Sequence, residues 1–238
     1  MKLSNYPTEY DQLIMTMTSL EKLCPQDVFL LLEEKKRTEV LPKGTVLFKE
    51  GVYPKDLFCV EKGKVKLYKT TDDGKKHIIR IAITGDVLGY RAILAGSRHS
   101  VTAELLEKST MSKINKDYFL ELMRKNNTFS EDVVKVLCQE LTLTQEKLIN
   151  VAYKPVRVRL ADALLTLENI FHQNHEGRGE DARISFSHEN IASLIGTTRE
   201  TVTRMMRDFE RDGLIQNGTL KIKIIDQKAL EKIRDQKA

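Results

Sequence analysis

The spacing of apolar residues changes twice along the chain and divides it into three zones. Up to about residue 36, leucines and valines recur at helical intervals around Pro25. From about Thr38 the interval shortens to two residues and glycines interrupt the pattern, which predicts short strands joined by turns. The strands are expected at residues 46–48, 57–60, 65–68, 77–83 and 101–103. An all-β sandwich or barrel is therefore expected in the first half of the chain.

The helical interval returns from about Ser130 and continues to Tyr153. An apolar seam with intervals of three and four along this stretch is typical of a helix that pairs with a second copy of itself. A single interior helix can show the same spacing. Val133, Val136 and Leu143 form a second apolar flank, which favours a helix that packs on two partners, one of them the β domain. The seam consists of Val134, Leu137, Leu141, Thr144, Leu148 and Val151.

The segment that begins at Ser187 predicts a helix, a tight turn and a second helix. Ser187 stands at an N-cap position, and Gly196 can take the positive φ that a sharp turn requires. Either Thr197 or Thr198 then caps the second helix, and the spacing from Thr197 to Glu200 fits a capping box.

The second helix is predicted to have two different faces. At about 100° per residue, one face is apolar and the other carries four arginines, a glutamate and a threonine. Arginine can donate two hydrogen bonds to guanine, and glutamate can accept one from cytosine. A solvated surface helix would show similar charges, but the preceding helix and turn favour a helix that reads nucleic acid. The polar face consists of Arg199, Glu200, Thr203, Arg204, Arg207 and Arg211.

A β-hairpin is expected directly after this helix. Asn217-Gly218 lies between two apolar runs, which is a strong signal for a type I′ turn. Lys221 and Lys223 on the second run are expected to contact phosphates. The helix-turn-helix and the hairpin together predict a winged DNA-binding motif.

These residues resemble the DNA-reading element of a bacterial regulator family. The family is that of the cyclic-AMP receptor protein and the fumarate-nitrate reduction regulator, and the resemblance covers residues from about 25 to 230. Its motifs here read Thr198-Arg199-Glu200-Thr201-Val202-Thr203-Arg204, Asp212-Gly213-Leu214-Ile215 and Gly85-Asp86-Val87-Leu88-Gly89. The resemblance implies an α+β fold with an N-terminal β-roll like a cyclic-nucleotide-binding jelly roll, a long dimerisation helix and a C-terminal winged helix-turn-helix. The implied domains are residues 1–127, 128–153 and 154–238.

The resemblance also implies a homodimeric transcription factor that binds double-stranded DNA and RNA polymerase. Arg199, Glu200 and Arg204 match the base-reading positions of the cyclic-AMP receptor branch, which implies a palindromic TGTGA-like site. The fumarate-nitrate branch has no arginine at the position of Arg199. His188 stands where the family often has a basic residue that contacts phosphate. The expected DNA-binding set is completed by Thr198, Thr203, Lys221 and Lys223.

The match to the family's effector site is only partial. In members that respond to cyclic AMP, a glutamate after the roll's glycine holds the ribose, and an arginine–serine pair holds the phosphate. Here Tyr90 follows Gly89, and His99-Ser100 replaces the pair. A neutral histidine is a poorer phosphate ligand than arginine, so we expect that cyclic AMP is not the effector. A different small ligand and an effector-free regulator remain alternatives, and haem is disfavoured because no attachment motif is present. The candidate effector-binding residues are Gly89, Tyr90, Arg91, Arg98, Ser100 and Thr144.

The amino-acid composition excludes some classes of protein but does not by itself indicate a function. The 39 basic and 34 acidic residues give a net charge of +5, so DNA affinity must come from the local placement of charge. Cys24, Cys59 and Cys138 are scattered, which argues against a four-thiolate iron–sulfur centre and favours buried thiols. No apolar run reaches the length of a membrane span, so a cytoplasmic protein without a membrane partner is expected.

Enzymes and protein-binding modules are the two other classes of function that such a fold can serve. His77 and His99 stand alone without a ligand cluster, so no metal site is expected and a metal-dependent jelly-roll enzyme is disfavoured. No nucleophile–base or paired-carboxylate arrangement supports catalysis, so no catalytic residue is expected. A ligand-binding module that acts through protein partners instead of DNA remains the alternative.

Overall fold

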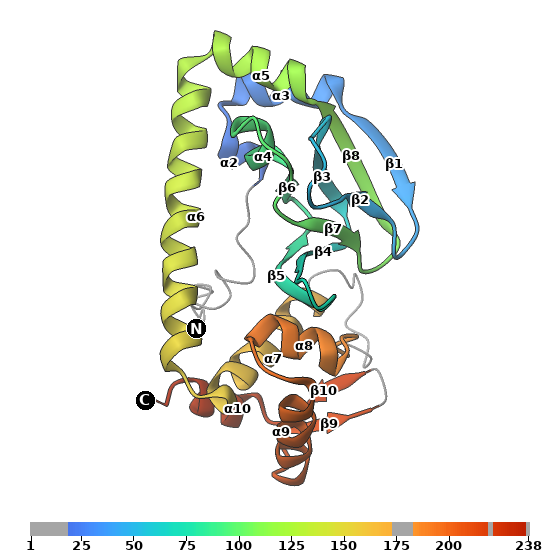
Figure 1. Ribbon diagram of the computed structural model, residues 1–238, viewed down its shortest axis with the longest axis vertical. Coiled ribbons are helices and arrows are strands. Elements are labelled where there is room, and N and C mark those ends of the chain that lie inside the picture. The colour runs from blue at the N-terminus through green and yellow to red at the C-terminus, as the bar shows by residue number, and fades with distance from the viewer. Residues whose placement is uncertain (1–18, 173–182, 219–220, 237–238) are drawn as a thin grey trace, which may run out of the picture. The chain divides into compact units, whose positions relative to one another are not determined.

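The structure, a computed structural model, describes residues 19–172, 183–218 and 221–236 (Figure 1). These residues form two compact units. The first ends at Thr144 and the second begins at Gln145, so the division falls inside one long helix, α6 (Asn127–Tyr153). The predicted α+β fold, with a β-roll, a long helix and a winged helix-turn-helix, is confirmed.

Two four-stranded antiparallel sheets build the roll of the first unit. The first sheet has the order β1 (Arg37–Leu41), β8 (Ser109–Asn115), β3 (Asp56–Lys62) and β6 (Val87–Leu88). The second has the order β2 (Val46–Phe48), β7 (Thr102–Leu105), β4 (Lys64–Thr70) and β5 (Lys76–Ile83). Because strand side chains alternate between faces, each sheet turns one apolar set inward. The core between the sheets contains Phe48, Val60, Val65, Ala82, Leu88, Ala103, Leu105 and Met111.

A second core lies where helices cover the other face of the first sheet. The helices are α2 (Leu20–Leu23), α3 (Gln26–Lys35), α4 (Tyr90–Leu94), α5 (Lys116–Lys125) and the start of α6. Leu57 and Cys59 of β3 point into this core, on the opposite side of the strand from Val60. Phe119 and Phe129 meet edge to face within it, with ring centroids 5.4 Å apart.

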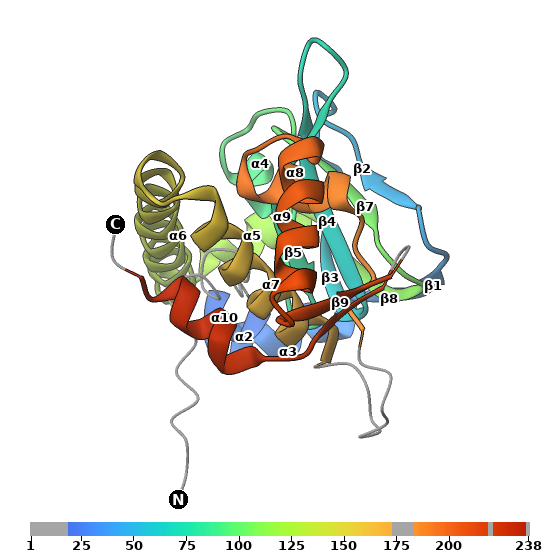
Figure 2. The same cartoon turned by 90° about the horizontal axis from the view of Figure 1, so that it is seen from below.

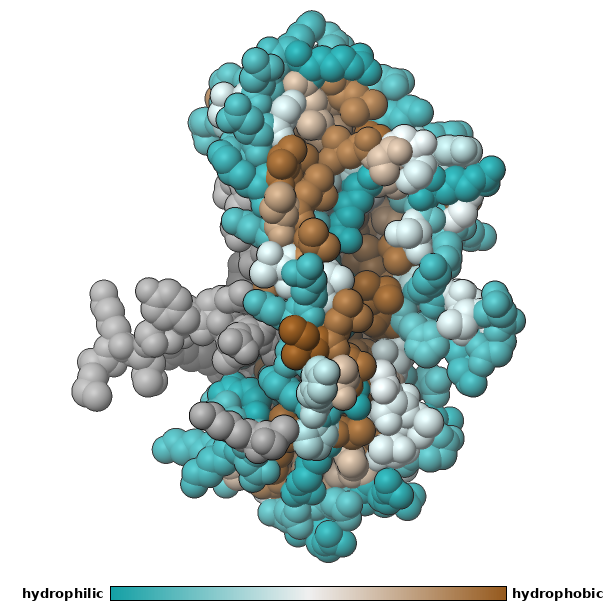
Figure 3. Space-filling model, turned by 60° about the vertical axis from the view of Figure 1, so that its left-hand side comes forward, coloured by the Kyte–Doolittle hydropathy of each residue, from teal (hydrophilic) through white to brown (hydrophobic). Residues whose placement is uncertain are grey.

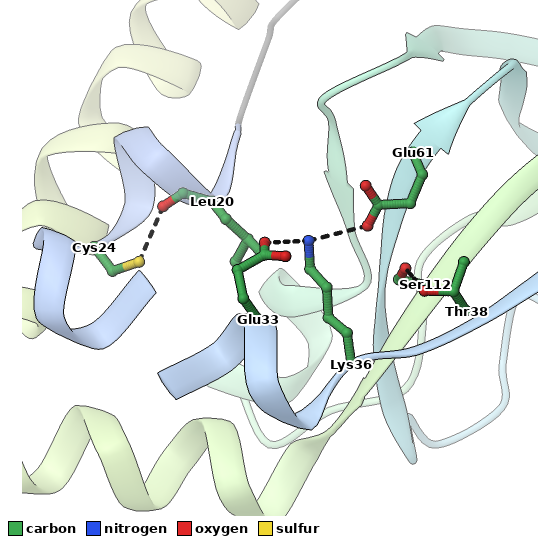
Figure 4. Close-up of polar contacts among 7 residues, drawn as sticks. All are labelled: Leu20, Cys24, Glu33, Lys36, Thr38, Glu61 and Ser112. Carbon is green, nitrogen blue, oxygen red and sulfur yellow. Dashed lines mark hydrogen bonds and ion pairs between the residues drawn. The ribbon is translucent and has the colours of Figure 1, made fainter. Parts of the chain in front are cut away.

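Polar contacts fasten the N-terminal helices to the roll (Figure 4). The amine of Lys36, which follows α3, pairs with Glu33 of that helix and lies 3.0 Å from a carboxylate oxygen of Glu61 on β3. Cys24 and Cys59 are buried, as expected, whereas Cys138 on α6 is exposed, so the prediction of three buried thiols is wrong for Cys138.

The long helix α6 has one covered and one open flank. Val133 and Val136 are buried in the helical core, which confirms the predicted flank for these two residues, whereas Leu143 is only partly buried and lies outside that core. Leu141 and Leu148 are 60% and 67% exposed, and Leu137 is partly buried against the core. Apolar side chains are visible along this helix in Figure 3, where it is turned toward the viewer.

The second unit continues from the end of α6 with a bundle of helices and a small ribbon (Figure 2). Its elements are α7 (Val156–His172), α8 (His188–Ile195), α9 (Arg199–Arg211), β9 (Ile215–Asn217), β10 (Ile222–Ile224) and α10 (Gln227–Arg234). α10 packs against α7, and α9 packs against both α8 and β9. Before α8, a single isolated antiparallel bridge joins Ile184 to Ile222 of β10. No helix within these described segments has the length and apolarity that a bilayer span needs.

The predicted hairpin exists, but its turn differs from the expected one. Asn217 is the last residue of β9 and pairs with Ile222 of β10, so Asn217 belongs to the strand ladder and not to the turn. A type I′ turn at Asn217-Gly218 would need positive φ at both residues, and neither has it. The prediction of a type I′ turn at Asn217-Gly218 is therefore wrong.

Candidate nucleic-acid interface and effector region

The helix-turn-helix is held by local hydrogen bonds that its sequence supplies. The hydroxyl of Ser187 accepts from the backbone N–H of Asn190 at 3.2 Å, which caps α8. Gly196 ends α8 with φ of 67°, a conformation that favours glycine. Thr198 caps α9 by accepting from the N–H of Thr201 at 3.2 Å. Thr198 is one of the two expected caps, so the capping box from Thr197 is wrong.

The two faces of α9 differ as predicted. Val202, Met206 and Phe209 are fully buried against the unit's core. In the described segments, no ion pair neutralises Arg199 or Arg204 on the exposed face. The exposed positions of this helix are Arg199, Glu200, Arg204, Arg207, Glu210 and Arg211.

One predicted member of the cationic face is partly neutralised. A guanidinium nitrogen of Arg211 lies 3.1 Å from a carboxylate oxygen of Asp208, and another lies 3.8 Å from Asp212. Exposed pairs of this kind are weak and break readily. The positive charge is nevertheless stronger in the first two turns of α9 than at its end.

His188 joins three elements of the motif. Its Nδ1 lies 3.1 Å from the hydroxyl oxygen of Thr203 on α9, and its Nε2 lies 3.2 Å from Oδ1 of Asn217 on β9. We call this arrangement the His188 bridge. Lys221, just before β10, and Lys223, within that strand, are both exposed.

A buried arginine fixes the turn of the motif to α7. Arg159 is 7% exposed, and its guanidinium donates to the carbonyls of Ile195 and Gly196, at the end of α8. It also donates to the carbonyl of Lys154, just before α7, at 3.2 Å. The open C-terminal carbonyls of α8 are thereby satisfied by a cation, which also opposes the helix dipole.

In members that respond to cyclic AMP, an arginine is expected to hold the phosphate. The matching residue here is His99, which packs against an aromatic ring. His99 is 5% exposed and stacks on Phe48, with ring centroids 4.0 Å apart. Burial lowers the pKa of His99, so the neutral imidazole is favoured near neutral pH. Gly89 has φ of 88° at the start of α4, and Tyr90 is buried.

The two predicted residues around His99 are exposed. Arg98 donates to the carbonyl of Gly51 at 2.8 Å, and its guanidinium lies 4.7 Å from the ring centroid of Tyr53. Ser100 is also exposed. The Arg98 guanidinium is therefore used to hold the loop before β3.

Arg91 lies in a charged cluster that joins α4 to α6. Its Nε is 2.8 Å from one carboxylate oxygen of Glu140, and the other oxygen is 3.6 Å from a guanidinium nitrogen of Arg80 on β5. Arg80 also lies 3.5 Å from Asp86, whose second oxygen accepts from the N–H of Ile83 at 2.8 Å. Glu140, Arg80 and Asp86 are buried, whereas the Arg91 side chain is 58% exposed.

Thr144, the expected effector contact on α6, lies one turn beyond this cluster. Its hydroxyl donates to the carbonyl of Glu140 at 2.8 Å, within its own helix. Sequence reasoning missed Glu140 and Arg80, although each leaves a signal. Arg80 interrupts the apolar run of β5, and Glu140 lies four residues after buried Val136, so both are charges on apolar faces.

No group of three or more His, Cys, Asp or Glu side chains suited to a metal ion occurs in the parts of the chain that the structure describes. The fold and the exposed arginine helix define a DNA-binding regulator, with a cyclic-nucleotide-type roll and a winged helix-turn-helix. The cyclic nucleotide-binding domain family matches residues 38–126, and the Crp-like helix-turn-helix domain family matches residues 158–233. The chain belongs to the Crp/Fnr family of transcriptional regulators, which are not enzymes.

Individual relatives agree with this assignment. The electron transport regulator A of Shewanella oneidensis is 29% identical over 195 residues, which cover 82% of this chain and 77% of the relative. The cyclic AMP receptor protein of Thermus thermophilus is 25% identical over 211 residues, which cover 89% and 94% of the two chains. A solved CRP/FNR-family regulator, also from Thermus thermophilus, has the same fold, with a TM-score of 0.70, 23% identity and coverage of 85% and 100%.

Proposed function

We propose that this protein is a homodimeric transcriptional regulator that reads a palindromic TGTGA-like site in the cytoplasm. The observation that carries the proposal is the exposed face of α9, where Arg199, Glu200 and Arg204 project from a capped and tightly packed helix. Arg199 and Arg204 donate to guanines, and Glu200 accepts from cytosine. Thr198 and the wing lysines hold the helix against the DNA backbone.

The open flank of α6 supports the homodimer. Its exposed apolar residues recur at coiled-coil spacing, and each aliphatic side chain contributes roughly 1.5–3 kcal/mol when fully buried. Two copies then present two α9 helices to half-sites about 34 Å apart, one turn of B-DNA. The seam residues in the proposal are Val134, Leu137, Leu141, Thr144, Leu148 and Val151.

Cyclic AMP is not the effector in this proposal. A cyclic phosphate needs a fixed cation or several N–H donors, and the matching position holds buried, neutral His99. Arg91, the basic residue of α4, already pairs with Glu140. Calorimetry with the purified protein should detect no sub-micromolar binding of cyclic AMP, and such binding would contradict the proposal.

Selection of bound sites from random duplex DNA tests the main proposal. We expect an inverted repeat, and a salt-sensitive affinity of the protein for it in fluorescence anisotropy. Arg199→Ala should cost about 1–3 kcal/mol and relax one base position in each half-site. Lys221→Ala should weaken all sequences alike and flatten the salt dependence.

The contrast between these two variants serves as the control. If both lost affinity equally on selected and scrambled sites, the assignment of base reading to Arg199 would be wrong. If no duplex bound in dilute buffer, a module that acts through protein partners would be favoured instead.

A further inference from the structure

The His188 bridge uses both nitrogens of the imidazole ring. Oδ1 of Asn217 can only accept, so Nε2 carries the hydrogen and donates to it across 3.2 Å. In the neutral ring Nδ1 is then an acceptor, and it receives the hydroxyl hydrogen of Thr203 across 3.1 Å. A neutral His188 in this position has no N–H left for a DNA phosphate.

Asn217 is held at a second point, which makes its position specific. Its backbone N–H donates to a carboxylate oxygen of Glu210 on α9 at 3.0 Å. The end of β9 is therefore tied to the second turn of α9 through His188 and Thr203, and to the last turn through Glu210. Gly218, the next residue, donates its N–H to the carbonyl of Lys221 at 3.0 Å, so the wing lysine follows directly from this anchor.

We infer that His188 is a positioning residue that sets the wing relative to the reading face of α9, in place of a direct phosphate contact. This inference rests on the proposed DNA-binding function. The separation between Lys221 and Arg204 decides whether a phosphate contact and a base contact form together, so a loose wing would weaken backbone binding without changing the base readers. Thr203 likewise acts through its bond to His188, because its hydroxyl hydrogen is already used.

The test compares variants that separate charge from bridging, in anisotropy titrations from about 50 to 200 mM salt. His188→Lys supplies a cation for phosphate but removes the two-sided bridge, and Asn217→Ala removes the acceptor without changing His188. We expect each to weaken binding about five- to tenfold, with the salt slope reduced by about 0.9 for each phosphate that the wing no longer neutralises. The double variant should be no weaker than either single variant, because both break one arrangement.

Gln216→Ala is the matched control, because Gln216 is the exposed neighbour of Asn217 on β9. It should bind as the wild type does. If His188→Lys bound as tightly as the wild type and Asn217→Ala were unchanged, His188 would be a direct phosphate ligand and the inference would fail. An equal loss of DNA affinity in Gln216→Ala would also overturn the inference, because any substitution in the wing would then weaken binding, with or without the His188 bridge.

Amide hydrogen exchange without DNA separates this inference from the proposed function. Removal of the bridge by Asn217→Ala or His188→Ala should accelerate exchange in β9 and β10, while α7 and α10 keep their protection. Unchanged exchange in β9 and β10 would contradict the bridge even if DNA binding were established. Faster exchange in a protein that bound no duplex would leave the bridge intact and refute only the DNA-binding proposal.

Discussion

Replacement of Glu140 by Gln should destabilise the first unit, because it removes one charge from a buried cluster. Loss of one partner from a buried ion pair costs about 3–5 kcal/mol, whereas exposed pairs contribute about 0–1 kcal/mol. The Arg80 side chain is 9% exposed but keeps Asp86 as a partner, and the Arg91 side chain is 58% exposed. We therefore expect Glu140→Gln to lower the free energy of unfolding by about 2 kcal/mol, less than the full cost of a buried pair.

Thermal unfolding followed by circular dichroism measures this loss. A decrease of about 2 kcal/mol corresponds to a fall in Tm of roughly 6–10 °C for a unit of this size. Asp132→Asn is the matched control, because Asp132 forms a 2.8 Å pair with Lys135 on the same helix but at the surface. Its Tm should stay close to that of the wild type. If Glu140→Gln and the wild type melted together, the cluster would not link α4 to α6 energetically.

Three further predictions concern the long helix and the thiols. Leu148→Glu should convert the proposed dimer to a monomer in analytical ultracentrifugation, whereas Leu30→Glu, at a position 55% exposed on α3, should leave the dimer intact. A monomeric wild type would refute the proposed seam. In native thiol titration, Cys138 should react first, because burial raises the pKa of both Cys24 and Cys59 from 9.0 to about 12. Unfolded thiols lose protons near the ordinary value while the folded ones do not, so stability should fall as pH rises from about 9 toward 12; a constant Tm across that range would contradict this.

Much of the fold follows from local spacing. The helices α6, α8 and α9 and the strands β2 to β5 have clear apolar periods, and their positions match the predictions closely. β1 and β8 lie outside the predicted strands. β8 carries serine and threonine next to its apolar residues, and its identity depends on pairing with residues of β1 and β3 that lie 48 to 76 positions earlier in the sequence. Such pairings are set by tertiary contacts that a local pattern does not contain.

In the candidate site, too, some features could be predicted from the sequence and others could not. The exposed face of α9 could be predicted because one helical period separates its arginines from Val202, Met206 and Phe209. The partners of His188 could not, because Asn217 lies 29 residues away in sequence. The sequence left two threonines as candidates for the N-cap of α9. Both have a hydroxyl that can accept the capping hydrogen bond, and the backbone conformation decides between them.

The separation of the two faces of α9 has an evolutionary consequence. Val202, Met206 and Phe209 hold the helix in place, while Arg199, Glu200 and Arg204 make no packing contribution to the core. Exchange of these three outer side chains therefore leaves the scaffold intact. A gene duplicate could acquire a new target sequence through a few substitutions here, without compensating changes elsewhere in the chain.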